Sequence, residues 1–460
     1  MAERILFLTG KLAERQLSRI LKAMKPEFSY KINQIGVSVA ALMSENIIMR
    51  RVKVDSKIDK IIIPGKFRGS IDNLRKYFNI PVERGPEDLT NLPDYFGLSS
   101  YKENLQKYDC LIFSEIVDAT ILTTDQIIGK AFKYKKDGAD VIDIGCMPDT
   151  KFEHLEEVIF KLKENKFKVS VDSANNDELI RGGKAGADYL LSISEKNIHV
   201  ANEVSSIPIL IPSSPGDMNS LERIIKKFIR KKRLFYADPI LDPIHYGFVD
   251  SIVRYKDLRK KFPKINILMG TGNLTELTDC DSVGVNTILM GLVSELSVGA
   301  VLVVQVSNHC RNSIRETDRA RKLMYYAKKN QRLPIGIDKS LMCLADRKVV
   351  RTEKDEIINF KELTRDKNYR IIIGHDGVNL FNANTLKTFT DPYEFYDFLD
   401  VQNDSGHAFY LGVELARAQI AFQLGKNYNQ DNELLWGVSS TPKKKENLEE
   451  RPKIKSTQKK

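Results

Sequence analysis

Apolar and polar residues alternate in a regular way along the central part of the chain. Eight short runs rich in Val, Ile and Leu are separated by longer stretches with apolar residues every three or four positions. Continuous apolar runs are typical of strands buried on both faces, and the longer stretches are typical of amphipathic helices. We expect strands within residues 109–117, 140–145, 168–173, 188–194, 207–214, 234–241, 265–270 and 300–307.

The number and order of these elements indicate the fold. Eight strands that alternate with helices over roughly 220 residues fit a (β/α)8 barrel, in the α/β class, better than an open doubly wound sheet. Such a barrel carries its functional residues at the carboxyl ends of the strands. We therefore expect a TIM barrel at the centre of the chain, with a site formed by the segments that follow the strands.

Shorter patterns flank the barrel on both sides. Apolar strands at residues 4–10 and 60–65, each followed by an amphipathic stretch, predict a small N-terminal α/β domain. No G-x-G-x-x-G follows either strand, so a docking or structural role is favoured over nucleotide binding. Residues 81–97, rich in Pro, Gly and Asp, indicate a loop and a domain boundary. A strand and turn at residues 369–381 and an amphipathic helix after Ser405 predict a C-terminal accessory α+β domain.

Charge adds one further segment. The net charge is +11, but the last twenty residues hold eight basic and three acidic side chains and so account for +5. The remaining +6 is spread over 440 residues, which predicts a disordered basic tail and no nucleic-acid surface on the folded part. We divide the chain into an N-terminal α/β domain (1–103), the barrel (104–330), a C-terminal α+β domain (331–440) and the tail (441–460).

Cysteine content and hydropathy indicate the compartment. The five cysteines are scattered without C-x-x-C pairs, and their number is odd, which favours a reduced intracellular protein over a disulfide framework or a zinc ribbon. The N-terminal MAERILFLTGK carries charges too early for a signal peptide, and no apolar run reaches the roughly 18 residues of a membrane span. We expect a cytoplasmic protein that binds neither nucleic acid nor membranes.

Acids and amides gather at the carboxyl ends of the predicted strands. An apolar strand that ends on a carboxylate, as at Asp172, is unfavourable unless the carboxylate is used. The parallel strands of a barrel place all their ends on one mouth, so we expect an acidic, amide-lined site there. The candidates at these ends are Glu115, Asp118, Asp143, Asp149, Asp172, Asn175, Ser192, Asn197, Asp238, Asp242, Gly270, Asn273 and His309.

Several chemistries suit such a set of side chains. No H-x-H or H-E-x-x-H spacing and no Cys–His nucleophile pair is present, so no metal is assigned, although aspartates without histidines suit magnesium. The same groups can accept hydrogen bonds from a planar heterocycle rich in N–H groups, such as a pterin. Each aspartate alone is also explained by a helix cap, as at Asp172 before N-N-D-E-L-I, or by a turn, as at Asp238 before Pro239.

Five segments carry a family resemblance. GADVIDIG, VSVDSANN, AGADYLLSIS, YADPILDPIHYGF and ILMGTGNLTEL, in this order, resemble the pterin-binding barrel superfamily. Its branches are dihydropteroate synthase and the methyltetrahydrofolate-dependent corrinoid methyltransferases. VDS-x-N and MGTGN resemble the methyltransferases, and the Ser-Arg-Lys segment of the synthase is absent. Residues 1–436 together resemble the archaeal dihydropteroate synthase-related proteins, which have additional N- and C-terminal domains and occur in organisms that use methanopterin.

The resemblance implies a reduced pterin ligand, tetrahydromethanopterin or tetrahydrofolate. Both branches have an Asn on the fourth strand where this chain has Leu191, so Asn197 in the following loop is the candidate substitute. Arg311 and Arg315 are the candidates for holding a phosphate or a glutamate-like tail, and a solvated surface is the simpler interpretation of both. The implied catalytic residues are Asn273 and Asp238, and the implied ligand-binding residues are Asp143, Asp172, Asn197, Asp238, Gly270 and Asn273.

These observations predict a pterin-dependent transferase, with methyl or one-carbon transfer favoured. A corrinoid on a partner protein is then the implied methyl carrier, and a homodimer is expected. The first alternative is a dihydropteroate synthase-like condensation in methanopterin or folate biosynthesis, which the missing Ser-Arg-Lys segment disfavours. The second is a pterin-binding protein that has lost catalysis, which Leu191 favours.

Overall fold

The chain forms two compact units in the computed structural model, Met1–Asp338 and Lys339–Lys460. The structure describes residues 3–37, 43–65, 67, 69–86, 89, 92–96, 105–349 and 351–440. The predicted basic tail at 441–460 lies outside the described residues, and the domain boundaries drawn from the sequence stay predictions. None of the helices in the described part of the chain is long and apolar enough to cross a membrane.

The N-terminal region is a parallel four-stranded sheet with the strand order β2-β1-β3-β4. Its elements are β1 (Arg4–Thr9), α1 (Lys11–Met24), β2 (Ser29–Gln34), α2 (Glu45–Arg51), β3 (Lys60–Ile63), α3 (Ile71–Phe78), β4 (Val82–Arg84) and α4 (Leu92–Tyr95). Strand β4 and helix α4 correct the interpretation of residues 81–97 as a loop. Both elements are shorter than the window over which a hydrophobic period can be recognised.

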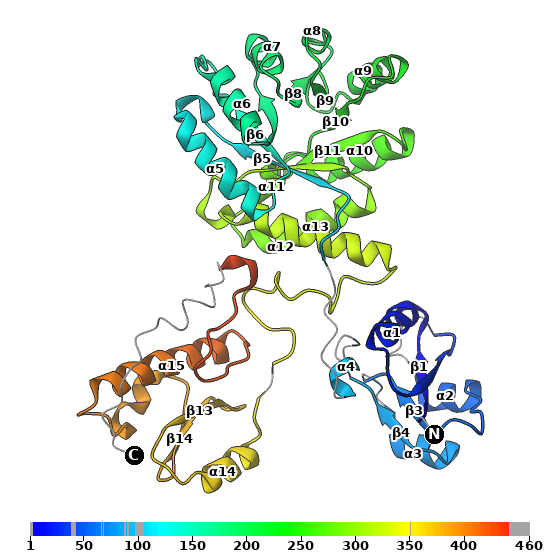
Figure 1. Ribbon diagram of the computed structural model, residues 1–460, viewed down its shortest axis with the longest axis vertical. Coiled ribbons are helices and arrows are strands. Elements are labelled where there is room, and N and C mark those ends of the chain that lie inside the picture. The colour runs from blue at the N-terminus through cyan, green and yellow to red at the C-terminus, as the bar shows by residue number, and fades with distance from the viewer. Residues whose placement is uncertain are drawn as a thin grey trace. The chain divides into compact units, whose positions relative to one another are not determined.

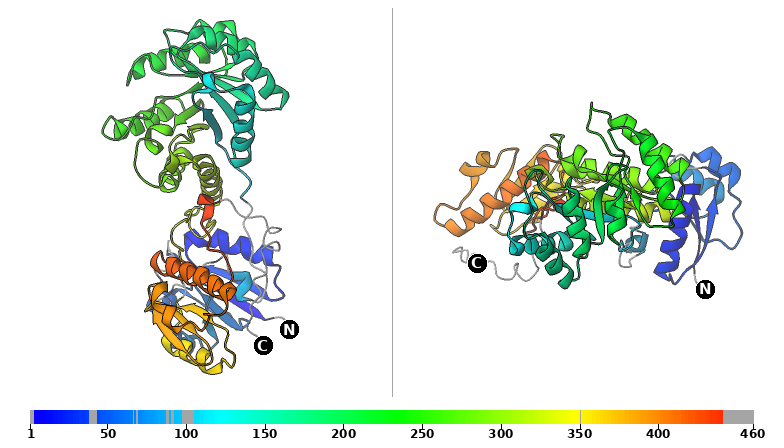
Figure 2. Two further views of the ribbon diagram at one scale, coloured as in Figure 1. Left: turned by 90° about the vertical axis from the view of Figure 1, so that its left-hand side faces the viewer. Right: turned by 90° about the horizontal axis from the view of Figure 1, so that it is seen from above.

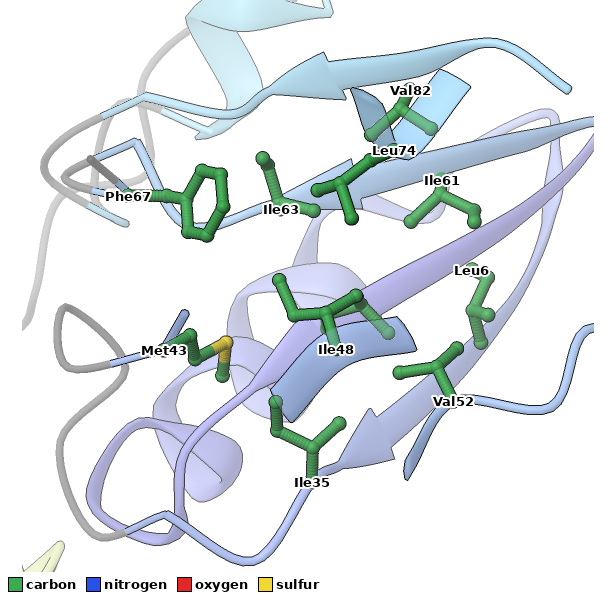
Figure 3. Packing of buried hydrophobic residues seen from close by; sticks show 11 residues of the cluster. Leu6, Ile35, Met43, Ile48, Val52, Ile61, Ile63, Phe67, Leu74 and Val82 are labelled. Atoms are coloured by element: carbon green, nitrogen blue, oxygen red, sulfur yellow. The ribbon is translucent and has the colours of Figure 1, made fainter. Parts of the chain in front are cut away.

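Side chains of β1 and β3 point alternately to the two faces of this sheet, and each face has its own apolar core. Phe7 and Ile62 pack against residues of α1 and α4 on one face. Leu6 and Ile61 point to the opposite face, where Ile48 of α2 and residues of α3 cover them, as Figure 3 shows. Successive side chains of a strand point to opposite faces, so one apolar strand serves both cores.

The barrel consists of eight parallel strands in chain order, and it closes where β12 pairs with β5. The strands are β5 (Leu111–Ile116), β6 (Val141–Gly145), β7 (Lys168–Asp172), β8 (Tyr189–Ile193), β9 (Ile207–Leu210), β10 (Tyr236–Ala237), β11 (Asn266–Gly270) and β12 (Ala300–Val303). Its helices are α5 (Thr124–Asp137), α6 (Leu155–Glu164), α7 (Asn176–Lys184), α8 (Val200–Glu203), α9 (Met218–Arg230), α10 (Phe248–Lys261), α11 (Gly272–Thr275), α12 (Ser282–Glu295) and α13 (Ser313–Lys329).

The predicted (β/α)8 fold is confirmed. Each of the eight predicted strand segments contains one barrel strand, and helices surround the strands in Figures 1 and 2. Strand β10 has only two residues, because Pro239 follows closely and cannot donate a ladder hydrogen bond.

Aromatic rings fill the barrel interior. Phe113, Tyr189 and Tyr236 meet edge to face. The ring centroid of Phe113 lies 4.8 Å from that of Tyr189 and 6.4 Å from that of Tyr236, and the two tyrosine rings are 6.1 Å apart. Such contacts are favourable, and the three rings belong to a packed apolar cluster inside the strands. Glu115 lies two residues beyond Phe113 on the same face of β5, so it stands nearer the mouth.

A buried arginine joins the last helix of the barrel to its first strands. Arg321 of α13 is 3% exposed and donates hydrogen bonds to the Cys110 carbonyl and to the carboxylates of Asp140 and Asp318. Its guanidinium also lies 3.6 Å from the ring centroid of Tyr108. A buried cation with this many partners is stabilised where it is, and removal of a partner is unfavourable.

The C-terminal unit combines an antiparallel sheet with helices, as the predicted α+β class requires. Its main elements are α14 (Lys354–Leu363), β13 (Arg370–Ile373), β14 (Val378–Phe381), β15 (Leu386–Phe389) and α15 (Ser405–Gln423), with the strand order β13-β14-β15. Leu411, Leu415 and Ala418 of α15 share a core with Ile371 and Leu380 of the sheet. The helical spacing of these apolar residues therefore creates the face that covers the strands.

Candidate functional site

Four carboxylates lie at the carboxyl ends of barrel strands. Glu115 of β5 is paired in register with Asp143 of β6, and Asp172 ends the neighbouring strand β7. Asp238 directly follows β10. All four were strand-end candidates in the sequence, and the parallel register places three of them side by side.

The carboxylates of Glu115, Asp143 and Asp172 form a tight cluster, in which one oxygen of each lies within 4.8 Å of the others. Asp143 is fully buried and accepts a hydrogen bond from the Ser170 hydroxyl. Gly145 gives Glu115 its room, because a Cβ at this glycine would lie 2.5 Å from the Glu115 Oε1 atom. A side chain at position 145 would therefore displace the Glu115 carboxylate.

Burial and mutual repulsion change the acidity of this cluster. Burial is the main cause that raises the pKa of Asp172 to about 7, and the carboxylates of Glu115 and Asp238 also raise it. The pKa of Asp143 lies well above its ordinary value, through burial first and then through Asp172 and Glu115. The pKa of Glu115 is raised by burial and by Asp118. These groups therefore retain protons closer to neutral pH than ordinary carboxyl groups do.

Asp238 has a polar environment of its own. Its Oδ1 atom accepts hydrogen bonds from the Tyr255 hydroxyl at 2.6 Å and from the Ile240 N–H at 2.7 Å. Burial raises the pKa of Asp238 to about 6, although these donors and the Arg254 guanidinium act in the opposite direction. Arg254 itself is held by an ion pair with Asp242 at 2.6 Å. Asp238 is thus positioned by a helix of the barrel, α10, and can change its protonation near neutral pH.

The turn after β11 carries Asn273. Its amide group donates to the Leu241 carbonyl at 2.7 Å, so Asn273 is joined to the loop that follows Asp238. The side chain is exposed, whereas Asp143 is buried and the other three carboxylates are half-buried. A Cβ at Gly270 would meet no atom within 4 Å among the described residues, so the end of β11 borders open space.

The side-chain amide of Asn197 already has hydrogen-bond partners in the protein. Its amide nitrogen donates to the Ser192 carbonyl at 3.1 Å and to Asn176 at 3.2 Å, and its oxygen accepts from the Ser194 N–H at 2.8 Å. Both N–H bonds of the amide therefore have protein partners. A ligand that binds Asn197 through its N–H groups would have to replace one of them.

Leu191 belongs to the apolar interior. It is 3% exposed and packs in the same cluster as Phe113 and Tyr189, opposite Asp172 in the strand register. The position at which the resembled families have an amide is therefore filled by an aliphatic side chain.

The two arginines after β12 differ in their contacts. Arg315 forms an ion pair with Asp137 at 2.7 Å, and Arg311 is exposed, with a weak hydrogen bond to Asn308 at 3.4 Å. The simpler interpretation of Arg315 was a solvated surface residue, and its contact with buried Asp137 corrects it. The ion pair also reduces its suitability as a free anion ligand.

Sequence reasoning missed Ser170, Tyr255 and Arg254. Ser170 precedes Asp172 by two residues, so the strand period places both inside the barrel, and this signal was available. Tyr255 and Arg254 lie in the middle of α10, 17 and 16 residues from Asp238, where no local pattern marks them.

Comparison with known proteins identifies one family model and one relative. A family of unknown function, DUF6513, matches residues 3–87, which lie in the N-terminal region. An uncharacterized protein of Methanocaldococcus jannaschii is 26% identical to this chain in an alignment 528 positions long, which covers 94% of this chain and 99% of that protein.

Three solved dihydropteroate synthases are similar to about half of the chain. The Yersinia pestis enzyme with a pterine-sulfa conjugate is 16% identical, with a TM-score of 0.38, over 49% of this chain and 95% of that one. The Xanthomonas albilineans enzyme with 7,8-dihydropteroate is 17% identical, with a TM-score of 0.38, over 50% and 96%. The Anaplasma phagocytophilum enzyme with bound 6-hydroxymethylpterin-monophosphate is 16% identical, with a TM-score of 0.37, over 47% and 99%.

Proposed function

We propose that this protein is a transferase that binds a reduced pterin at the barrel mouth, with methyl or one-carbon transfer favoured over condensation. The observation that carries the proposal is the pair Asp172 and Asp238, two acids at strand ends whose pKa values are raised to about 7 and about 6. A pterin edge presents amino and ring N–H groups beside a carbonyl. Carboxyl groups that can be either ionised or protonated suit such a mixed edge.

The chemistry of methyl transfer suits the same residues. A methyl group leaves N5 of a reduced pterin more readily when that nitrogen carries positive charge, because the leaving amine is then neutral. In this proposal Asp238 supplies or holds the proton, and Tyr255 positions Asp238 through the 2.6 Å hydrogen bond. Asn273, joined to the loop after Asp238, would contact the pterin near the reacting nitrogen. A corrinoid on a partner protein would receive the methyl group, and a homodimer is the expected assembly.

Condensation is the second candidate. That reaction releases diphosphate and needs a cationic group to stabilise it. The paired state of Arg315 disfavours condensation, and the exposed Arg311 is the other of the two candidate arginines after β12. A third candidate, a pterin-binding protein without catalysis, is favoured by the apolar Leu191 inside the barrel.

The test is calorimetric titration of the full chain with tetrahydromethanopterin, its N5-methyl derivative and dihydropterin diphosphate. We expect the reduced pterins to bind and Asp238→Asn to weaken binding at least ten-fold, the effect of about 1.4 kcal/mol from one hydrogen bond to a charged group. Asp250→Asn is the matched control, because Asp250 is an exposed acid in the first turn of α10, the helix that carries Tyr255.

Three results would decide between the candidates. Binding of a methylated reduced pterin, followed by methyl transfer to free cob(I)alamin, supports the proposal. Binding of the diphosphate alone would select condensation instead. If none of the three pterins binds at millimolar concentration, pterin recognition is refuted altogether.

A further inference from the structure

The cluster of Glu115, Asp143 and Asp172 has the spacing of ligands around one ion. One oxygen of each carboxylate lies within 4.8 Å of the other two. Two oxygens bound to the same cation are separated by at most twice the metal–oxygen distance, which is about 5 Å for Ca²⁺ and about 4.2 Å for Mg²⁺. The 4.8 Å limit therefore lies within the range for Ca²⁺, and Mg²⁺ would require the oxygens to lie within the shorter distance. The three residues come from adjacent strands, so the barrel scaffold holds this spacing.

Asp143 provides an independent reason to expect a ligand. Its side chain is completely buried, and its Oδ2 atom has no hydrogen-bond partner among the described residues. The other oxygen, Oδ1, accepts from Ser170. An unpaired buried oxygen is unfavourable whether the group is ionised or protonated, because a protonated Oδ2 would in turn lack an acceptor. A bound cation would be a partner for the ionised Oδ2 atom and would displace a proton from it.

The charges around the cluster are of one sign. The charged groups that act on its three carboxylates are all other acids, and burial strengthens the repulsion between them. The strand register pairs Glu115 with Asp143, and the missing side chain at Gly145 leaves the space that the Glu115 carboxylate occupies.

We infer that Glu115, Asp143 and Asp172 form a binding site for one hard divalent cation of the Mg²⁺, Mn²⁺ or Ca²⁺ class at the mouth of the barrel. The donor set selects this class, because carboxylate oxygens suit hard cations and the site contains no imidazole or thiolate ligand among the described residues. Three protein oxygens leave further coordination positions for water or for an oxygen of a bound substrate. No metal could be assigned from the sequence, since an oxygen-only site has no histidine spacing to mark it.

The test uses the full-length untagged chain, freed of metal with a chelator and titrated without any pterin. Mn²⁺ is the spectroscopic probe, and electron paramagnetic resonance measures the free ion. Calorimetry with Mg²⁺ and Ca²⁺ then distinguishes the ions within the class. The variants are Asp143→Asn and Glu115→Gln, and Asp125→Asn is the matched control, because Asp125 is an exposed acid in the first turn of α5, the helix that follows β5.

We expect one Mn²⁺ per chain, at least ten-fold weaker binding in both variants, and unchanged binding in the control. Without metal, Glu115→Gln should unfold at or above the temperature of the wild-type chain, because it removes an acid that its acidic neighbours repel. Metal should raise the unfolding temperature of the wild-type chain alone. If Asp143→Asn does not fold, the inference is tested with Glu115→Gln alone, because Glu115 is only half-buried.

Two results would overturn the inference: no stoichiometric Mn²⁺, Mg²⁺ or Ca²⁺ binding at millimolar concentration, or full binding in Glu115→Gln. Tight Ca²⁺ with weak Mn²⁺ binding would support it and select the larger ion. The outcome is separate from that of the proposed function, because the pterin test depends on Asp238 and this test depends on Glu115.

Discussion

The hydrogen bond between Tyr255 and Asp238 permits a quantitative prediction. The Tyr255 hydroxyl donates to the Asp238 Oδ1 atom at 2.6 Å, and the tyrosine is completely buried. The substitution Tyr255→Phe removes only the hydroxyl and keeps the ring that packs in the barrel wall. We predict that the variant is destabilised much more at pH 8 than at pH 5.

The direction of this pH dependence follows from the pKa of Asp238. Its ordinary value is 3.8, and burial raises the pKa to about 6 in the folded protein. The folded state therefore binds the proton more tightly than the unfolded state, and this group contributes stability that is lost as the pH rises from about 4 to about 6. The shift of about two units corresponds to about 3 kcal/mol. Removal of the Tyr255 donor raises the folded-state pKa of Asp238 further and extends this loss to higher pH.

The expected loss of stability in Tyr255→Phe differs between the two pH values. A hydrogen bond to an ionised group contributes about 2 kcal/mol and one to a neutral group about 1 kcal/mol. For a barrel of this size, each kcal/mol corresponds to about 3 °C in the unfolding temperature. We therefore expect Tyr255→Phe to lower the temperature of the barrel transition by about 6 °C at pH 8 and about 3 °C at pH 5.

Differential scanning calorimetry is the suitable assay, because the single tryptophan, Trp436, lies outside the barrel and its fluorescence does not report on barrel unfolding. Tyr246→Phe is the control, since this tyrosine lies in the loop before the same helix and is 82% exposed. The other carboxylates contribute equally to the variant and to the wild type, so their contribution cancels in the difference between the two unfolding temperatures. An equal shift at both pH values would mean that Tyr255 acts only through packing, and the reasoning would be wrong.

Three further substitutions test other parts of the barrel. Gly145→Ala places a Cβ where the Glu115 Oε1 atom lies 2.5 Å away, so we expect Mn²⁺ binding at least ten-fold weaker and about 1–3 kcal/mol less stability, measured by calorimetry. Arg321→Ala leaves Asp140 without its buried cation and should destabilise the barrel by about 3–5 kcal/mol, with partial recovery in Arg321→Lys, measured by thermal unfolding. Leu191→Asn should lower stability by about 2–4 kcal/mol, and tighter pterin binding in that variant would indicate that the aliphatic residue limits recognition.

The fold was predictable because the signals were local and repeated. Each barrel strand is an apolar run and each large helix an amphipathic stretch, so length and alternation alone lead to the barrel. Strand β4 escaped prediction because three residues between Pro81 and Gly85 carry no period, and the sheet pairing with β3 stabilises it. Tertiary contacts decide the structure of so short a segment.

The site was predictable only in part. Strand ends identified Asp143, Asp172 and Asp238, because the position of a carboxylate after an apolar run is visible in one dimension. The partners that change their acidity were not visible, since Tyr255 reaches Asp238 from the middle of a helix. Asn197 shows the converse limit, because sequence position could not reveal that its amide is already hydrogen-bonded within its loop.

The contact of Arg321 with the first barrel strands has a consequence for the order of folding. The arginine meets the Cys110 carbonyl across 211 residues of chain and the Asp140 carboxylate across 181. Contacts between residues so far apart in sequence form late, because a long loop must close first. During synthesis Asp140 has its partners Tyr108 and Ile112 early but lacks the arginine until α13 has been made, so this contact can form only when the barrel is nearly complete.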